Sequence, residues 1–232
     1  MNKVLFTIPN NKNNNYVERE LEVERETIIE YNNITNYVEI APNVYSFNLY
    51  DSNVDNIYVL YNNACQLKKE NKIDALEMFK RCVKLINNTT KREIVYEIFI
   101  NLALLVSEIK GSSSSEEVGK YYEEALKIFS DRAEPYFYWS IYCNRIHHFE
   151  KAYYLLNKAL LFSYEQARIT YPETQFTAYG KYLYNELSIA CYSLKKYDEA
   201  KLLLEKIIDD PDLVYFKESA KEKLENIIKN IN

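Results

Sequence analysis

The amino-acid sequence predicts a mainly all-α fold, an α-α superhelix (solenoid) of about four helix pairs that follows a small irregular or β-containing N-terminal appendage. Two observations carry this prediction. From about Asn53 onward, apolar residues recur at the three- and four-residue spacing of a helix face. The 232 residues include only three glycines, which leaves little material for a sheet fold punctuated by glycine turns. We expect residues 1–52 to form the appendage and residues 53–232 the helical domain.

The appendage is predicted to be partly extended. Val4 to Ile8 and Val44 to Tyr50 have the composition of strands. The run from Asn10 to Asn15 is a low-complexity polar linker. The segment from Glu18 to Glu30 is rich in glutamate and fits either a solvated helix or a strand.

The first two helix pairs are expected at about residues 55–87 and 92–130. Asn71-Lys72 interrupts the first apolar pattern, and the polar run from Asn87 to Thr90 supplies capping residues for the next helix. After the last pair, the segment from Leu213 to Ile228 predicts a C-terminal capping helix. The lysines of this capping helix that we expect to face outward are Lys217, Lys221 and Lys223.

Two later helix pairs share one register, which marks them as internal repeats. The small residues Ala152 and Ala200 hold the same place in two similar segments, 149–160 and 197–208. Matching residues stand 16, 13 and 9 places before each alanine: Tyr136, Trp139 and Cys143 in one unit, and Tyr184, Leu187 and Cys191 in the other. Such a match across two helices is hard to obtain by chance.

This register resembles the tetratricopeptide repeat (TPR), in which helices A and B pack as an antiparallel pair around a small residue. Val118 and Ala152 are 34 residues apart, which is the TPR period. Ala152 and Ala200 are 48 residues apart, so we expect an insertion between the third and fourth units, around residues 165–177. The resemblance implies a TPR-like fold.

Residues 130–210 also resemble a more particular variety of helical repeat. The segments that carry this likeness run from Arg132 to Tyr153, opening with Arg-Ala-Glu, and from Tyr182 to Tyr192, which contains Glu-Leu-Ser-Ile-Ala-x-Tyr. Similar segments accompany sugar-transferase domains in bacteria and giant viruses. The chain leaves no room for the catalytic α/β domain of those enzymes. The resemblance therefore implies, as an alternative function, an accessory subunit or module of a glycosyltransferase system.

Composition and charge restrict the function further. Gly111, Gly119 and Gly180 cannot form a Rossmann or P-loop fingerprint, so we expect no nucleotide cofactor. A formal net charge of −5 disfavours attraction to nucleic acid, which leaves RNA binding as a weaker alternative. We expect a cytoplasmic protein without a membrane segment, since the N-terminal apolar run is short and the four cysteines are scattered. Abundant Asn, Lys, Ile and Tyr fit an AT-rich genome, such as that of a large DNA virus, whose product would lie in the host cytoplasm.

The residue types that usually carry catalysis or metal binding do not form a convincing set. His147 and His148 are expected in a surface turn, without the further ligand that zinc requires. Asp210-Pro211-Asp212 has the Asp-x-Asp spacing of some metal sites, but a solvated helix end explains it better. We therefore predict no catalytic residue, no metal, no cofactor and no enzymatic activity.

The predicted function is that of a scaffold or adaptor which binds another protein. The A helices line the concave face of a TPR superhelix, where aromatic rings supply contact area and Asn side chains both donate and accept hydrogen bonds. Such a face suits an extended peptide or a partner helix of unknown identity. The predicted partner-binding residues are Asn63, Gln66, Glu134, Phe137, Ile141, Asn144, Arg145, Tyr182, Asn185, Ile189 and Tyr192.

One known TPR groove is not expected here. TPR domains that bind chaperone tails resemble a basic clamp, in which inward Lys and Arg residues grip a C-terminal carboxylate. The inward sites of this chain instead hold Val59, Glu134 and Tyr138. A partner that binds through its terminal carboxylate is therefore disfavoured.

Overall fold

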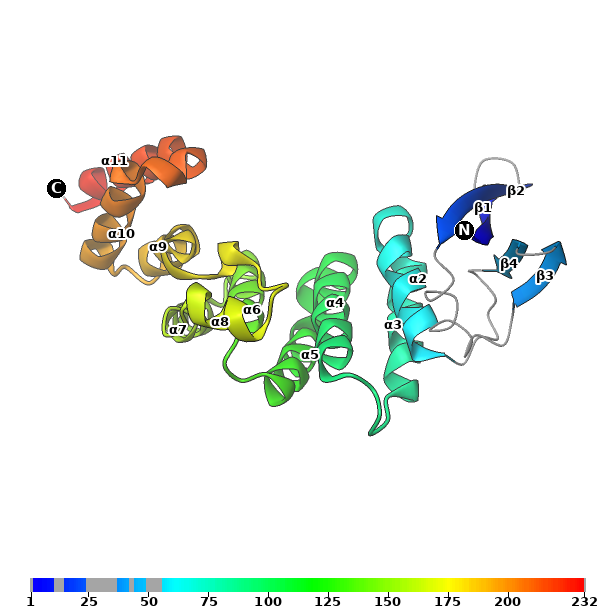
Figure 1. Ribbon diagram of the computed structural model, residues 1–232. Helices are drawn as coiled ribbons and strands as arrows, with labels where there is room; N and C mark the ends of the chain where they lie inside the picture. Colours follow the sequence, from blue (N-terminus) through cyan, green and yellow to red (C-terminus); the bar gives the residue numbers. More distant parts are fainter. Residues whose placement is uncertain (1, 11–14, 24–36, 42–43, 49–55, 232) are drawn as a thin grey trace. The chain divides into compact units, whose positions relative to one another are not determined.

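The computed structural model describes residues 2–10, 15–23, 37–41, 44–48 and 56–231 (Figure 1). By its internal contacts the chain divides into two compact units, Met1–Ile94 and Val95–Asn232. The domain boundary expected between residues 52 and 53 lies outside the described residues and stays a prediction.

The described N-terminal residues form one four-stranded sheet with the order β2-β1-β4-β3. Its strands are β1 (Asn2–Asn10), β2 (Asn15–Val23), β3 (Tyr37–Ala41) and β4 (Val44–Asn48). β1 pairs antiparallel with β2 and parallel with β4, and β3 pairs antiparallel with β4. The prediction of a β-containing appendage is confirmed.

The two segments expected to be extended coincide with β1 and β4, as far as Asn48. The glutamate-rich segment, left open between helix and strand, is strand β2 as far as Val23. Of the predicted polar linker, Asn10 and Asn15 are partners in the β1–β2 register. Residues 11–14, 24–30 and 49–50 of these predicted segments lie outside the described residues.

The first helix pair consists of α2 (Ile57–Glu70) and α3 (Lys72–Leu85). Asn71 closes one helix and opens the other: its main-chain N–H donates to the Leu67 carbonyl at 2.7 Å, and its Oδ1 accepts from Ile73 N at 3.1 Å. The main-chain N–H thus closes α2 and the short polar side chain caps α3, which is why the periodic pattern breaks there. The α3 residues that face the core, all 0% exposed, are Ala75, Phe79 and Cys82.

Three further helix pairs follow along the chain. They are α4 (Arg92–Lys110) with α5 (Ser115–Ile128), α6 (Glu134–Arg145) with α7 (Phe149–Ala159), and α9 (Tyr184–Ser193) with α10 (Tyr197–Asp209). The 3₁₀ helix η1 (Gly111–Ser114) joins α4 to α5. The capping segment is the 3₁₀ helix η4 (Pro211–Phe216) followed by α11 (Lys217–Ile231), which packs against α10 (Figure 1).

The pairs α6–α7 and α9–α10, which share the repeat register, also have the same backbone conformation in the turn between their two helices. His147 and Lys195, also 48 residues apart, both adopt a positive φ, 63° and 60°, in the turn after an A helix. The N–H that follows each donates back into the helix, His148 N to Cys143 O at 2.8 Å and Lys196 N to Cys191 O at 2.9 Å. These are Schellman-type helix ends, made twice at the same repeat position.

The expected insertion lies between α7 and α9. It contains α8 (Tyr164–Thr170) and the 3₁₀ helices η2 (Phe176–Ala178) and η3 (Gly180–Leu183). The apolar core of the second unit includes Ala178 and Leu183 from this insertion, together with Ala200 and Ile207 of α10. The insertion is therefore part of the packed core.

Between residues 56 and 231 the regular secondary structure is helical, as predicted. Within the described residues, none of the helices combines the length and the apolar character needed to span a bilayer.

Candidate partner-binding surface

Consecutive A helices α6 and α9 are joined by the amide of Asn144. Its Nδ2 donates to both the main-chain oxygen and the carboxylate Oε2 of Glu186, at 3.0 Å each. Asn144 is 8% exposed, and its Oδ1 is buried without a hydrogen-bond partner in the part of the chain that the structure describes. Because one buried side chain bonds both the main chain and the carboxylate of Glu186, it fixes the spacing between these two A helices.

This polar link continues toward the C-terminal helix. Asn185 Nδ2 donates to Glu186 Oε1 at 3.1 Å, and Lys223 Nζ of α11 donates to Asn185 Oδ1 at 3.2 Å. Burial lowers the pKa of Lys223, while the carboxylates of Glu186 and Glu222 act in the opposite direction. The prediction that Lys223 faces outward is therefore wrong, because the end of its side chain lies against α9.

The eleven residues predicted to bind a partner separate into two groups by exposure. The structure buries the first group, which consists of Asn63, Glu134, Phe137 and Asn144. The second group is half-buried or exposed: Gln66, Ile141, Arg145, Tyr182, Asn185, Ile189 and Tyr192. Partner binding by these residues stays a prediction, but only the second group offers accessible side-chain surface.

Two residues of α6 and two of α9 provide apolar, aromatic and cationic side chains on the accessible surface. Ile141 and Arg145 lie one helical turn apart on α6, and Ile189 and Tyr192 lie three residues apart on α9. The guanidinium of Arg145 donates to the Ser107 carbonyl at 2.7 Å, which restrains this exposed side chain. We call the accessible side chains Ile141 and Arg145 of α6 and Ile189 and Tyr192 of α9 the A-helix face.

Glu134 does not lie on this face but in a buried ion pair with Arg132. The Arg132 Nη2–Glu134 Oε1 distance is 2.7 Å, and Arg132 Nε donates to Glu134 Oε2 at 3.2 Å. The guanidinium also lies 4.3 Å from the centroid of the Tyr96 ring and 5.1 Å from that of Tyr171. Two hydrogen bonds and two aromatic faces replace the water that this charge loses on burial.

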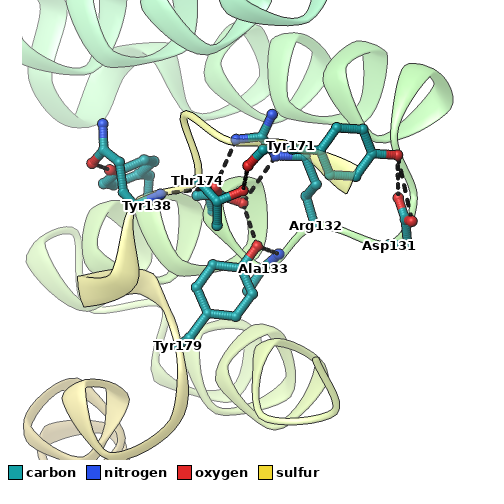
Figure 2. A network of polar contacts seen from close by, with 9 residues as sticks. Asp131, Arg132, Ala133, Tyr138, Tyr171, Thr174 and Tyr179 are labelled. Carbon is teal, nitrogen blue, oxygen red and sulfur yellow. Dashed lines mark hydrogen bonds and ion pairs between the residues drawn. The ribbon is translucent and has the colours of Figure 1, made fainter. Parts of the chain in front are cut away.

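The same ion pair fastens the insertion to α6, as the network in Figure 2 shows. Tyr179 OH donates to Glu134 Oε2 at 2.8 Å and accepts from Ala133 N at 3.2 Å. Gln175 N donates to Glu134 Oε1 at 3.3 Å, and the Tyr138 hydroxyl bonds the Gln175 side chain. Sequence reasoning missed this role of Glu134, because Gln175 and Tyr179 of the insertion lie more than forty residues away from it in the chain.

The charges of this network shift the pKa values of Tyr179 and Arg132. Burial, together with the negative charge of Glu134, raises the pKa of Tyr179 above its ordinary value. For Arg132, burial alone would lower the pKa, but the hydrogen bond to Glu134 and nearby negative groups outweigh it and raise the pKa. Arg132 therefore stays charged in the interior.

The residues considered for metal binding have other roles. His147 and His148 are exposed in the α6–α7 turn, and the His147 ring contacts Phe149 edge-on. Asp210 and Asp212 both bind Lys181 Nζ, at 2.9 Å and 2.6 Å. No group of three or more His, Cys, Asp or Glu side chains with metal-binding geometry occurs among the described residues.

Comparison with solved structures finds proteins of similar fold. A double mutant of MamA from strain RS-1 aligns with a TM-score of 0.50 and 12% identity, over 75% of this chain and 93% of that one. YrrB, a TPR protein with an unusual peptide-binding site, aligns with a TM-score of 0.51 and 12% identity, over 72% and 75% of the two chains. A tetratricopeptide repeat protein from Parabacteroides merdae aligns with a TM-score of 0.53 and 13% identity, over 77% and 61%.

These likenesses show that the chain has a TPR-like fold, as the repeat register predicted. Scans against protein-family models and curated protein sequences find no match. The suggested link to glycosyltransferases has no support in these comparisons. At 12–13% identity, these likenesses show the fold alone.

Proposed function

We propose that this protein is a non-enzymatic adaptor whose A-helix face binds an extended peptide or a helix of a partner protein. The observation that carries the proposal is the link from Asn144 to Glu186, which fixes α6 and α9 while leaving Ile141, Ile189 and Tyr192 accessible. A surface held rigid before binding loses less conformational entropy when the partner arrives.

The chemistry of the A-helix face suits a protein partner. Ile141, Ile189 and Tyr192 offer apolar and aromatic area, and Arg145 offers hydrogen-bond donors. Their three- and four-residue spacing matches the way a helical surface presents contacts to a groove-bound segment. The peptide-binding site of YrrB, a protein of similar fold, adds support for a peptide as the ligand.

The two alternatives have weaker support. An accessory role in a glycosyltransferase system rests on the sequence resemblance of residues 130–210 alone. RNA binding would require a basic surface, whereas the chain has a formal net charge of −5. Neither alternative is favoured by a contact among the described residues.

Selection from a displayed peptide library on the full-length protein tests the proposal. The dissociation constants of the selected peptides are then measured by fluorescence anisotropy for wild type and for Ile141→Ala/Tyr192→Ala. We expect the double variant to bind at least about tenfold more weakly, since apolar and aromatic contacts dominate such interfaces. The matched control is Leu202→Ala, which removes an apolar side chain from α10 that is more exposed (59%) than Tyr192 (36%).

Folding of each variant is checked by helical circular dichroism and by the fluorescence of Trp139, the only tryptophan. Peptides that bind wild type and the folded double variant with equal affinity would show that the A-helix face is not the binding surface. Failure of the library to yield any saturable binder would also count against a peptide-binding adaptor.

A further inference from the structure

The insertion forms a pocket whose lining includes only Tyr182 of the predicted partner-binding residues. Its volume is about 440 Å³, within the range of sites that hold small ligands. Tyr182, predicted to lie on the concave face, is part of its wall. The residues that line the pocket are Phe162, Ser163, Tyr164, Glu165, Phe176, Tyr179, Gly180, Lys181 and Tyr182.

Aromatic rings meet at steep angles in this pocket. The rings of Phe176 and Tyr182 lie 5.2 Å apart at 80°, and those of Tyr164 and Phe176 lie 6.4 Å apart at 72°. Tyr164 and Tyr179 lie 5.9 Å apart at 60°. Phe176 remains 51% exposed, so an aromatic surface is open to a ligand. Ring faces carry partial negative charge and attract cations.

Elsewhere in the second unit, the chain covers aromatic faces with its own cations. Lys151 Nζ lies 4.0 Å from the Trp139 centroid, and Lys196 Nζ lies 4.6 Å from that of Tyr153. Among the described residues, no lysine or arginine lies over the rings of Tyr164, Phe176 or Tyr182 in this way. The pocket rings are therefore available to a cation from another molecule.

The charged groups beside the rings favour the same kind of ligand. The Glu165 carboxylate accepts a hydrogen bond from Ser163 Oγ at 3.1 Å, and within the described part of the chain it forms no ion pair. Lys181, which also lines the pocket, is already bound by the carboxylates of Asp210 and Asp212. Because Asp210 and Asp212, which do not line the pocket, engage the Lys181 ammonium, the Glu165 carboxylate in the pocket wall is left to attract a cation from another molecule.

We propose that this pocket binds the side chain of an arginine in a partner protein. A guanidinium is planar, so it can stack on the Phe176 or Tyr164 ring and donate two parallel hydrogen bonds to Glu165. The volume exceeds that of one side chain and leaves room for the neighbouring backbone. The pocket is a second binding site, and its test does not depend on the A-helix face.

The test uses the full-length protein and two small probes that differ in charge. N-acetyl-arginine amide is titrated while aromatic carbon–proton NMR correlations are recorded, and the titration is repeated with the neutral isostere N-acetyl-citrulline amide. We expect saturable shifts at Tyr164, Phe176 and Tyr182, with citrulline binding at least about tenfold more weakly, because it lacks the cation–π and charge-assisted contacts. Added salt is expected to weaken the arginine binding.

Two variants locate the site. Phe176→Ala removes the exposed ring and Glu165→Gln removes the negative charge, and each is expected to weaken binding of the arginine probe several-fold. Tyr215→Ala is the matched control, since that ring is 99% exposed and does not line the pocket. Equal binding of the citrulline probe, or unchanged binding by both folded pocket variants, would overturn the proposal. Tighter binding of tetramethylammonium than of the arginine probe would overturn the assignment to a guanidinium.

Discussion

Arg132 and Glu134 stand two residues apart in the chain and form an ion pair of 2.7 Å with side chains only 5% and 4% exposed. A charge so deeply buried is tolerated only when an opposite charge and further hydrogen bonds replace its water. Here the replacement includes Tyr179 and Gln175 from the insertion. The pair thus links the start of α6 to a segment that lies after α7.

Glu134→Ala is expected to lower the free energy of unfolding of the second unit by about 3–5 kcal/mol, because it leaves the Arg132 charge buried without its partner. Denaturant unfolding followed by Trp139 fluorescence measures this, since that single tryptophan belongs to the second unit. The double variant Arg132→Met/Glu134→Ala is expected to cost less than the sum of its single changes. Additive costs would show that the two side chains do not act as a pair.

His147→Gly is expected to raise the free energy of unfolding by up to about 1 kcal/mol. His147 has a φ of 63°, a conformation that strains a residue with a Cβ and that glycine adopts readily. His148→Gly is the matched control, because its φ of −90° is already favourable for any residue. A loss of stability in His147→Gly equal to that in His148→Gly would mean that the positive φ carries no strain.

Three of the four cysteines are expected to resist thiol reagents in the folded protein. Burial raises the pKa of Cys82 and of Cys191 to about 12, and that of Cys143 to about 11. Since the thiolate is the reactive form, a raised pKa leaves less of it near neutral pH. Titration with a chromogenic aromatic disulfide should modify Cys65, which is half-buried, before the others. Rapid modification of all four without denaturant would contradict this.

Lys181→Met is expected to raise the pKa of Asp210. The hydrogen bond from Lys181, with help from Asp212 N, holds the pKa of that carboxyl below its ordinary value. A depressed pKa in the folded state stabilises the fold above the unfolded-state pKa of about 3.9, and this contribution is lost as the pH falls through the folded value. NMR titration of the Asp210 carboxyl in wild type and variant measures the shift. Lys201→Met, which removes a lysine paired with Glu205, should leave it unchanged.

Much of the helical architecture could be predicted from the sequence. The breaks at Asn71 and Pro211, the insertion after α7 and the shared register of Ala152 and Ala200 all match the structure. These features depend on periodicity, caps and small residues, which act over a few neighbours along the chain. The same register places Ile141 and Tyr192 among the predicted partner-binding residues, and the structure leaves both at least partly exposed.

The predictions that failed concern side chains whose partners are distant in sequence. The register predicts Glu134 on the concave face, but Tyr179, 45 residues further along the chain, holds it in the interior together with the neighbouring Arg132. Lys223 was expected in solvent and instead bonds Asn185 of α9. The sequence alone determined the helix pairs and their TPR-like register, because local periodicity encodes them. Only the tertiary structure decided which polar side chains are buried, because Glu134 and Asn185 bond residues 45 and 38 positions further along the chain. It also decided where the insertion leaves a pocket, because ring contacts such as that between Phe176 and Tyr182 depend on how the insertion folds back on itself.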